Sequence, residues 1–232
     1  THNAAAATWT GDCTKTITVT FTAADACNNK STTTASFTIT DTTPPTASDP
    51  GPLTVQCLDD VPDPDINVVT DEADLCHPPV VEFVQDESDG NICPLTITRT
   101  YRVKDNCGNE ILVKQIITVS DVEPPVMTCP AAPVAVCSID ETPAYANFAQ
   151  FLAASGSATD NCAIKEDSFI LLSETVSGDI CPLVYTRIYQ IEDLCGNKTT
   201  CTQTITVEDL VPPIITCPEP LVAECDLTEQ PS

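Results

Sequence analysis

Basic residues are scarce in this chain of 232 residues, in which nine Lys and Arg stand against 34 Asp and Glu, a formal charge of −25. Nucleic-acid binding rests on neutralising phosphates with basic groups, so this balance excludes a nucleic-acid partner. It equally disfavours an anionic membrane surface. The sequence also lacks an apolar run of about 18 residues, so no membrane span is expected in this segment.

Catalytic residues are missing from any usable arrangement. The only histidines are His2 and His77, and neither is placed beside a nucleophile and an orienting group, as a hydrolase requires. Acidic residues are plentiful but form no distinctive pair for glycoside chemistry. We therefore expect no enzymatic activity.

An internal repeat is what the chain does contain. Residues 181–225 match residues 93–137 at about half of the paired positions, including all four shared cysteines, and residues 13–57 match both more loosely. Such a period has to be found before a fold is assigned. It predicts the C-terminal part of a repeat domain at 1–43, full domains at 44–122 and 123–211, and the first strand of a following domain at 212–232.

No signal peptide or anchor is visible in the sequence. Together with the two partial repeats, this favours an internal segment of a longer protein. The expected partners are then the neighbouring repeats of that same chain.

One strand recurs in every repeat, at residues 15–23, 95–103 and 183–191, and it alternates apolar with polar residues. Each copy ends in a turn whose cysteine is followed by Asn28, Gly108 or Gly196, the residue types that best tolerate a left-handed backbone. A second strand follows each turn. We therefore expect a tight hairpin in each repeat.

Paired prolines follow each hairpin and mark the predicted domain boundaries, because proline cannot sit inside a sheet ladder and stiffens a connection. Only one helix is predicted, a short one with Thr142 as its N-cap and Gly156 at its end. Many short strands with regularly spaced turns predict an all-β fold of tandem immunoglobulin-like β-sandwich domains, disulfide-bonded and arranged in an extended rod.

Two arginines, Arg99 and Arg187, fall in the inward phase of the recurring strand. A buried guanidinium needs a carboxylate or carbonyl partner. The sequence favours a buried or edge ion pair over a ligand contact at both positions.

Fourteen cysteines at repeated positions indicate disulfides and an oxidising, extracellular compartment. Zinc binding is the weaker interpretation, because no C-x-x-C pair occurs and there are only two histidines. A domain of 80–90 residues buries a modest core, so such fastening is expected.

The direction of the strands predicts the disulfide partners. Two cysteines at opposite ends of one extended strand cannot bond, so cysteines at the same end of a domain are paired. The positions of Cys129 and Cys201 are replaced together in the second domain, by Asp49 and Val113, as expected for a bonded pair. The predicted disulfides are Cys57–Cys93, Cys76–Cys107, Cys137–Cys181, Cys162–Cys195 and Cys129–Cys201, with Cys13, Cys27, Cys217 and Cys225 bonded outside this segment.

The recurring CPLTITRTYRVKDNCGN, the TITV strand, the D-x-x-P-P linker and the TCP opening resemble hyalin-repeat-like (HYR-like) domains. They look like the repeats of very large Bacteroidota surface adhesins of the gliding-motility type. The resemblance covers nearly all of the chain. It implies an immunoglobulin-like fold, export by the type IX secretion system, and a role as a cell-surface filament or adhesin. The first repeat departs from it with ACNNK in place of CGN, and the second lacks the TCP cysteine.

Two classes of function fit these features. The first is a structural stalk in surface attachment or gliding, located on the bacterial cell surface. The second is a module that binds a glycan or a protein through its loops. Such a module should expose aromatic residues in loops, whereas Trp9 is the only tryptophan. The stalk is therefore favoured.

Acidic residues recur where one repeat meets the next. Hard cations bind clustered oxygen ligands, so calcium is the candidate cofactor. The alternative is that these side chains cap turns through the local backbone, as Asp does routinely, and the sequence favours it. The candidate ligands are Asp41, Asp74 and Asp105 at one boundary and Asp121, Asp160, Asn161 and Asp193 at the next.

Overall fold

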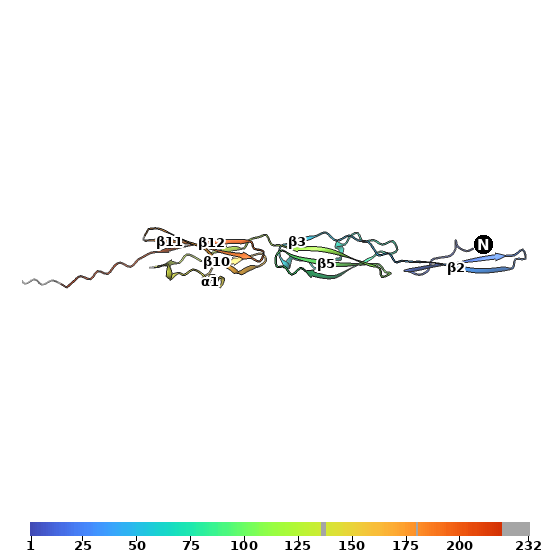
Figure 1. The fold of residues 1–232 in the computed structure, drawn as a ribbon, viewed down its shortest axis with the longest axis horizontal. Coiled ribbons are helices and arrows are strands. Elements are labelled where there is room, and N and C mark those ends of the chain that lie inside the picture. Colours follow the sequence, from blue (N-terminus) through green and yellow to red (C-terminus); the bar gives the residue numbers. More distant parts are fainter. Residues whose placement is uncertain (136–137, 180, 220–232) are drawn as a thin grey trace, which may run out of the picture. The chain divides into compact units, whose positions relative to one another are not determined.

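The structure, a computed structural model, describes residues 1–135, 138–179 and 181–219. The strands are β1 (Thr14–Ala24), β2 (Lys30–Thr40), β3 (Leu53–Val55), β4 (Val80–Ser88), β5 (Leu95–Lys104), β6 (Glu110–Val119), β7 (Val126–Thr128), β8 (Val134–Ala135), β9 (Ser157–Thr159), β10 (Ile164–Ser177), β11 (Leu183–Asp193) and β12 (Lys198–Val207). The helical segments are the 3₁₀ turns η1 (Leu58–Asp60), η2 (Ile66–Val68) and η3 (Ile139–Glu141) and the α-helix α1 (Phe148–Ala153). The predicted all-β, disulfide-bonded fold is confirmed (Figure 1). Within the described ranges, no helix has the length and apolar character to cross a membrane.

Two compact units make up the chain. The first holds residues 1–126, 158–168 and 191–199, and the second holds the other described residues. The first unit therefore contains more than one repeat, because it includes the loop before β10 and the turn between β11 and β12. Of the four disulfides between described residues, three lie inside it.

The second repeat is built on a four-stranded sheet in the order β3-β6-β5-β4. Strand β5 pairs antiparallel with β4 and β6, whereas β3 runs parallel to β6. Tyr101 and Val103 of β5 are completely buried and pack with Val113 of β6 and with Val69, which follows η2. An irregular layer thus covers one face of the sheet, as in a β-sandwich with a reduced second sheet.

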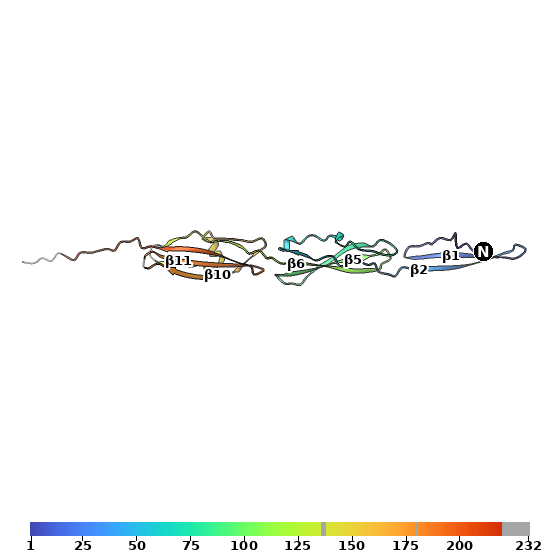
Figure 2. The same cartoon turned by 90° about the horizontal axis from the view of Figure 1, so that it is seen from above.

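The third repeat has the same order of strands, β10-β11-β12-β8, with β8 parallel to β12, and a second small sheet of β7 and β9. Figure 2 labels its paired strands β10 and β11. Its core is aromatic. Phe151 and Tyr189 are completely buried, and their ring centroids lie 5.9 Å apart. Phe169 stacks on Tyr189 at 5.5 Å. This cluster is the main difference between the two cores.

The predicted helix exists, but its start was placed too early. Asn147 is the N-cap of α1, and its side chain accepts a hydrogen bond from the Gln150 N–H. Thr142 instead closes the 3₁₀ turn η3. Gly156 is close to the predicted end, where a Cβ would come within 2.5 Å of the Phe151 ring. The glycine is therefore required by packing of the aromatic core.

The recurring strand and its turn are confirmed. β1, β5 and β11 cover the three predicted ranges. In the turns that follow them, Asn28, Gly108 and Gly196 have φ angles of 64°, 94° and 88°. Nothing lies within 4 Å of a Cβ built on either glycine, so the left-handed backbone alone explains the choice of residue.

Both inward arginines form buried ion pairs, as predicted. Arg99 is 3% exposed and donates to both carboxylate oxygens of Asp86, each at 2.9 Å. Arg187 is 4% exposed and donates to Glu174 and to the Thr142 carbonyl. These contacts satisfy the guanidinium groups within their own repeats, so neither is available to a ligand.

Candidate functional site: the joints between repeats

Three disulfides connect cysteines that belong to consecutive repeats. We call first joint the residues around Cys13–Cys107, and second joint those around Cys57–Cys162 and Cys93–Cys195. The Cα atoms of the three pairs lie 5.1, 5.2 and 5.0 Å apart, as disulfides require. In the register of the repeat, Cys13–Cys107 and Cys93–Cys195 are equivalent disulfides. Each joins the cysteine before the recurring strand of one repeat to the turn cysteine of the next repeat.

The predicted pair Cys57–Cys93 is therefore wrong. Both cysteines do lie at the same end of the second repeat, as the strand directions required. However, Cys57 follows β3 and Cys93 precedes β5, on opposite sides of β6, whose Val119 pairs with both strands. Two strand spacings separate them by about 10 Å, beyond the reach of a disulfide. The available partners are in the next repeat.

The predicted pairs Cys76–Cys107 and Cys162–Cys195 are also wrong. Cys107 is bonded to Cys13, and Cys162 and Cys195 are bonded to the preceding repeat. Cys76 is exposed and has no disulfide partner in the part of the chain that the structure describes. The prediction that Cys13 has its partner outside this segment fails with them.

The structure contains the predicted Cys129–Cys201 disulfide, within the third repeat, with a Cα–Cα distance of 5.5 Å. Cys137 and Cys225 lie outside the described residues, so the pairing Cys137–Cys181 stays a prediction. Cys27, Cys181 and Cys217 have no disulfide partner among the described residues.

An aspartate organises each hairpin turn. In the second joint, Asp193 accepts hydrogen bonds at one oxygen from the Cys195 and Asn197 N–H groups (2.8 and 2.9 Å) and at the other from the Asn197 side chain (2.7 Å). Asp105 makes the same three bonds in the first joint. The turn-capping interpretation of these two residues is therefore correct. Burial opposes ionisation of Asp105, but the bonds from Asn109 and Cys107 together lower its pKa.

Two further carboxylates meet in the second joint. Asp121 is 5% exposed and accepts from the Glu123 N–H (3.0 Å) and the Asn161 side chain (3.2 Å) at one oxygen only. Asp160 likewise accepts from the Cys162 and Ala163 N–H groups at one oxygen. Burial, and after it the charge of Asp121, raises the pKa of Asp160 against the effect of the Cys162 N–H. The second joint thus holds two acidic side chains close together, and Asp121 is buried.

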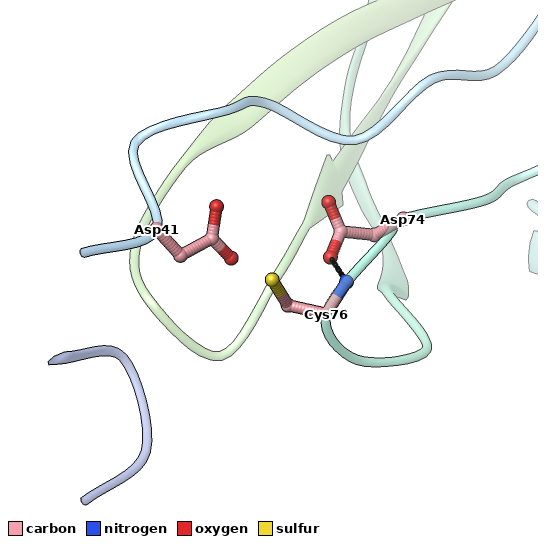
Figure 3. Close-up of side chains that lie close together, drawn as sticks. All are labelled: Asp41, Asp74 and Cys76. Atoms are coloured by element: carbon pink, nitrogen blue, oxygen red, sulfur yellow. Dashed lines mark hydrogen bonds between the residues drawn. The ribbon is translucent and has the colours of Figure 1, made fainter. Parts of the chain in front are cut away.

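The equivalent cluster in the first joint includes a thiol. Figure 3 shows Asp41 and Asp74 on either side of the Cys76 sulfur, with the Cys76 N–H donating to Asp74 at 2.8 Å. Oxygens of Asp41 and Asp105 also lie within 4.8 Å of each other and of the Cys107 sulfur. Partial desolvation and a hydrogen bond with Asp41 raise the pKa of the Cys76 thiol. A raised pKa disfavours the thiolate, which is the nucleophilic form of cysteine.

A pocket of about 700 Å³ surrounds the two disulfides of the second joint. Its walls include all four bonded cysteines, Asp121 and Asn161, together with apolar side chains such as Ile92 and Leu194. In the first joint, the positions of Ile92 and Leu194 are occupied by the polar residues Asp12 and Asn106. There Asp12 binds His77 at 2.9 Å and accepts from the Asn106 side chain at 2.9 Å.

The structure brings together most of the predicted cation ligands. Asp121, Asp160 and Asn161 meet in one cluster, and Asp41 lies beside Asp74 and beside Asp105. Sequence reasoning missed Asn197, whose side chain bonds both Asp193 and, at 3.0 Å, the Asp121 carbonyl. The signal was present, because every recurring turn has an asparagine at this position (Asn29, Asn109 and Asn197).

Comparison with known proteins identifies one segment. A family model described as an HYR-like domain with 4 cysteines matches residues 45–119. This range contains Cys57, Cys76, Cys93 and Cys107. None of the four is bonded to another of the four; three of them are bonded to cysteines outside the matched range. Residues 45–119 are thus HYR-like, as the resemblance implied. Three of their cysteines form the disulfides of the two joints.

No curated protein matches the chain. Among solved structures, it is similar to the protocadherin GammaB4 extracellular domain at 13% identity and a TM-score of 0.33, covering 84% of this chain and 40% of that one. It is also similar to a PcdhgB3 EC1-4 structure at 12% identity and a TM-score of 0.31, covering 86% of this chain. The chain spans 40% and 58% of the lengths of these two proteins.

Proposed function

We propose that this chain is a structural segment of a long secreted cell-surface adhesin or filament, in which it acts as a disulfide-stapled stalk. The single observation that carries the proposal is the covalent route through the joints. Because disulfides persist in oxidising compartments, the same observation supports an extracellular location. The charge of −25 favours solubility and self-repulsion along such a protein.

The route uses a strand as a tether. Cys13 is bonded to Cys107, the chain runs back from Cys107 to Cys93 through β5, and Cys93 is bonded to Cys195. The shortest covalent path from Cys13 to Cys195 therefore contains the 14 residue steps from 107 to 93, most of them in an already extended strand. Fully stretched, these steps span at most about 50 Å.

Tension along the chain would therefore pass through β5 and two disulfides. It would not have to be resisted by the hydrogen bonds of the sheets. Without the disulfides, the 182 steps from residue 13 to residue 195 could extend to about 600 Å. A stalk that has to transmit force without lengthening needs this arrangement, whereas an enzyme or a soluble binding domain does not.

Stretching single molecules tests this proposal. The oxidised chain 1–232, held at its two ends, is expected to show no lengthening from residues 13–195, and the reduced chain should lengthen by several hundred Å. If cysteines were paired within repeats, residues 13–57 and 107–137 would extend even under oxidising conditions. Equal lengthening of the oxidised and reduced chains would overturn the stalk proposal.

The proposal extends to the arrangement of the repeats. Short connections with paired prolines support repeats that follow one another end to end as a rod, with the boundaries predicted at 44–122 and 123–211. By the same register, Cys27 would bond to a neighbouring repeat of the longer chain. Small-angle scattering of the oxidised chain should then give an elongated profile, and a compact one would contradict the rod.

The proposed setting is the surface of a Bacteroidota cell, with export by the type IX system and a part in attachment or gliding. It is supported by the recurring CPLTITRTYRVKDNCGN-type motif and by the HYR-like match over residues 45–119. Antibodies raised against the chain should label intact cells of the source organism. Labelling only after the cells are permeabilised would contradict a surface location.

A further inference from the structure

The second joint contains two buried carboxylate oxygens without a hydrogen-bond partner. They are the second oxygens of Asp121 and Asp160, and both are inaccessible to solvent. Asp121 as a whole is 5% exposed, and an oxygen of each carboxylate lies within 4.8 Å of the other. The turn-capping bonds described above occupy only the first oxygen of each group.

This arrangement is unfavourable for two ionised groups alone. A buried acceptor without a donor loses its hydration without compensation. Two carboxylates that share a site also repel each other. The nearby amides do not reach these oxygens: the Asn161 side chain donates to the other oxygen of Asp121. The Asn197 side chain donates to the Asp121 backbone carbonyl and to Asp193. A cation would supply the missing partner of both oxygens.

We propose that Asp121 and Asp160 bind a calcium ion between their unpartnered oxygens, with water completing the coordination. Hard cations with several oxygen ligands suit the donor set. A thiophilic metal does not suit it, because the Cys162 sulfur beside the two carboxylates is held in a disulfide. With two carboxylates, the expected dissociation constant is on the order of 10⁻⁴ to 10⁻³ M, the range of extracellular modules.

The ion would connect the same two repeats as the disulfides. Asp121 ends the segment after β6, and Asp160 belongs to the loop that carries Cys162. This inference does not depend on the adhesin proposal. The calcium site can be disproved while the disulfide-stapled stalk is confirmed, and the stalk can be disproved while the calcium site is confirmed.

Calorimetry and thermal unfolding of the oxidised chain test the site. After treatment with a chelator, titration with calcium chloride should release or absorb heat with saturation, and millimolar calcium should raise the midpoint of unfolding by a few degrees. The double substitution Asp121→Asn with Asp160→Asn should abolish both effects. Asp63→Asn, at an exposed position, is the matched control and should preserve them.

The order of stabilities gives a second readout. In chelator, the double substitution should unfold at the same temperature as the parent or higher, because it removes a carboxylate repulsion; in calcium, the order should reverse. A parent chain without a calcium-dependent shift would overturn the proposal. So would a shift of the same size in the double variant, because the ion would then bind elsewhere.

Discussion

The two joints of this molecule are built on the same turn, and among the described residues the second joint has one disulfide more than the first. Asp105 and Asp193 make identical sets of hydrogen bonds, and Cys13–Cys107 is repeated as Cys93–Cys195. The second joint adds Cys57–Cys162. In the first joint, the residue equivalent to Cys162 is Cys76, which has no disulfide partner among the described residues.

The comparison shows that each disulfide of this kind needs both repeats. The cysteine at the start of β5 or at the end of β3 cannot be satisfied by its own sheet, because β6 separates the two. A repeat therefore presents cysteines at both ends, and these are bonded only where the neighbour supplies the partner. In the first joint, Asp12 contributes polar contacts to His77 and Asn106 in addition to the one disulfide.

The largest expected effect is the loss of disulfides from the second joint. Because each closes a loop of more than 100 residues, removing either should cost about 2–4 kcal/mol of unfolding free energy. If the bonds are separate, the double substitution Cys57→Ser with Cys93→Ser should destabilise the chain more than either single substitution in denaturant titrations. Cys27→Ser is the control and should have no effect. A double variant no less stable than either single one would show that Cys57 and Cys93 are bonded to each other.

The next largest loss of unfolding free energy is expected for substitution of the asparagine in the hairpin turn. Asn197→Ala should cost more than Asn109→Ala by about 1 kcal/mol. Both lose the bonds to their aspartate, but only Asn197 also donates to the Asp121 carbonyl across the second joint. Urea denaturation of the two variants measures the difference. Equal losses would mean that the contact to Asp121 contributes nothing.

A smaller loss of unfolding free energy is expected at the position that is Asn161 in the second joint and Leu75 in the first. Asn161 donates to Asp121, whereas its counterpart Leu75 is 93% exposed. Asn161→Leu should therefore lower the unfolding free energy by about 0.5–1.5 kcal/mol, and Leu75→Asn should not lower it. Thermal unfolding of both variants is the measurement. A destabilising Leu75→Asn would contradict the equivalence of the two positions.

The smallest effect is a difference in pH dependence. The pKa of Asp105 is lowered in the folded chain, so its stabilisation is present above the unfolded-state pKa and is lost as pH falls through the folded value. The pKa of Asp160 is raised, so its ionised form destabilises at neutral pH, and this penalty fades as pH falls through the folded value. In chelator, Asp160→Asn should stabilise at neutral pH and Asp105→Asn should destabilise. A destabilising Asp160→Asn together with a stabilising Asp105→Asn would contradict the two pKa directions.

Much of the fold could be predicted from local patterns. Period-two alternation identified β1, β5 and β11, and the residue after each turn cysteine identified the left-handed position. The start of α1 was placed too early because Thr142–Pro143 has the composition of a helix start. The aromatic core determines the real start, since Phe148 and Phe151 must face Phe169 and Tyr189.

The disulfide partners required more than the strand directions. Those directions place Cys57 and Cys93 at one end of the second repeat but do not give the order of strands in the sheet. The order β3-β6-β5 decides the matter, because it inserts β6 between the two cysteines. Cys129–Cys201 could be predicted, since both positions change together within one repeat. The unpartnered oxygens of Asp121 and Asp160 depend on burial, which the sequence does not specify.

Peptide mapping under non-reducing conditions tests the central claim most directly. The oxidised chain is digested at low pH to prevent exchange, and the linked peptides are identified by mass spectrometry. The expected linked peptides join Cys57 to Cys162, Cys93 to Cys195 and Cys13 to Cys107. Peptides that join Cys57 to Cys93, or Cys162 to Cys195, would contradict the account, because the repeats would then be bonded only within themselves.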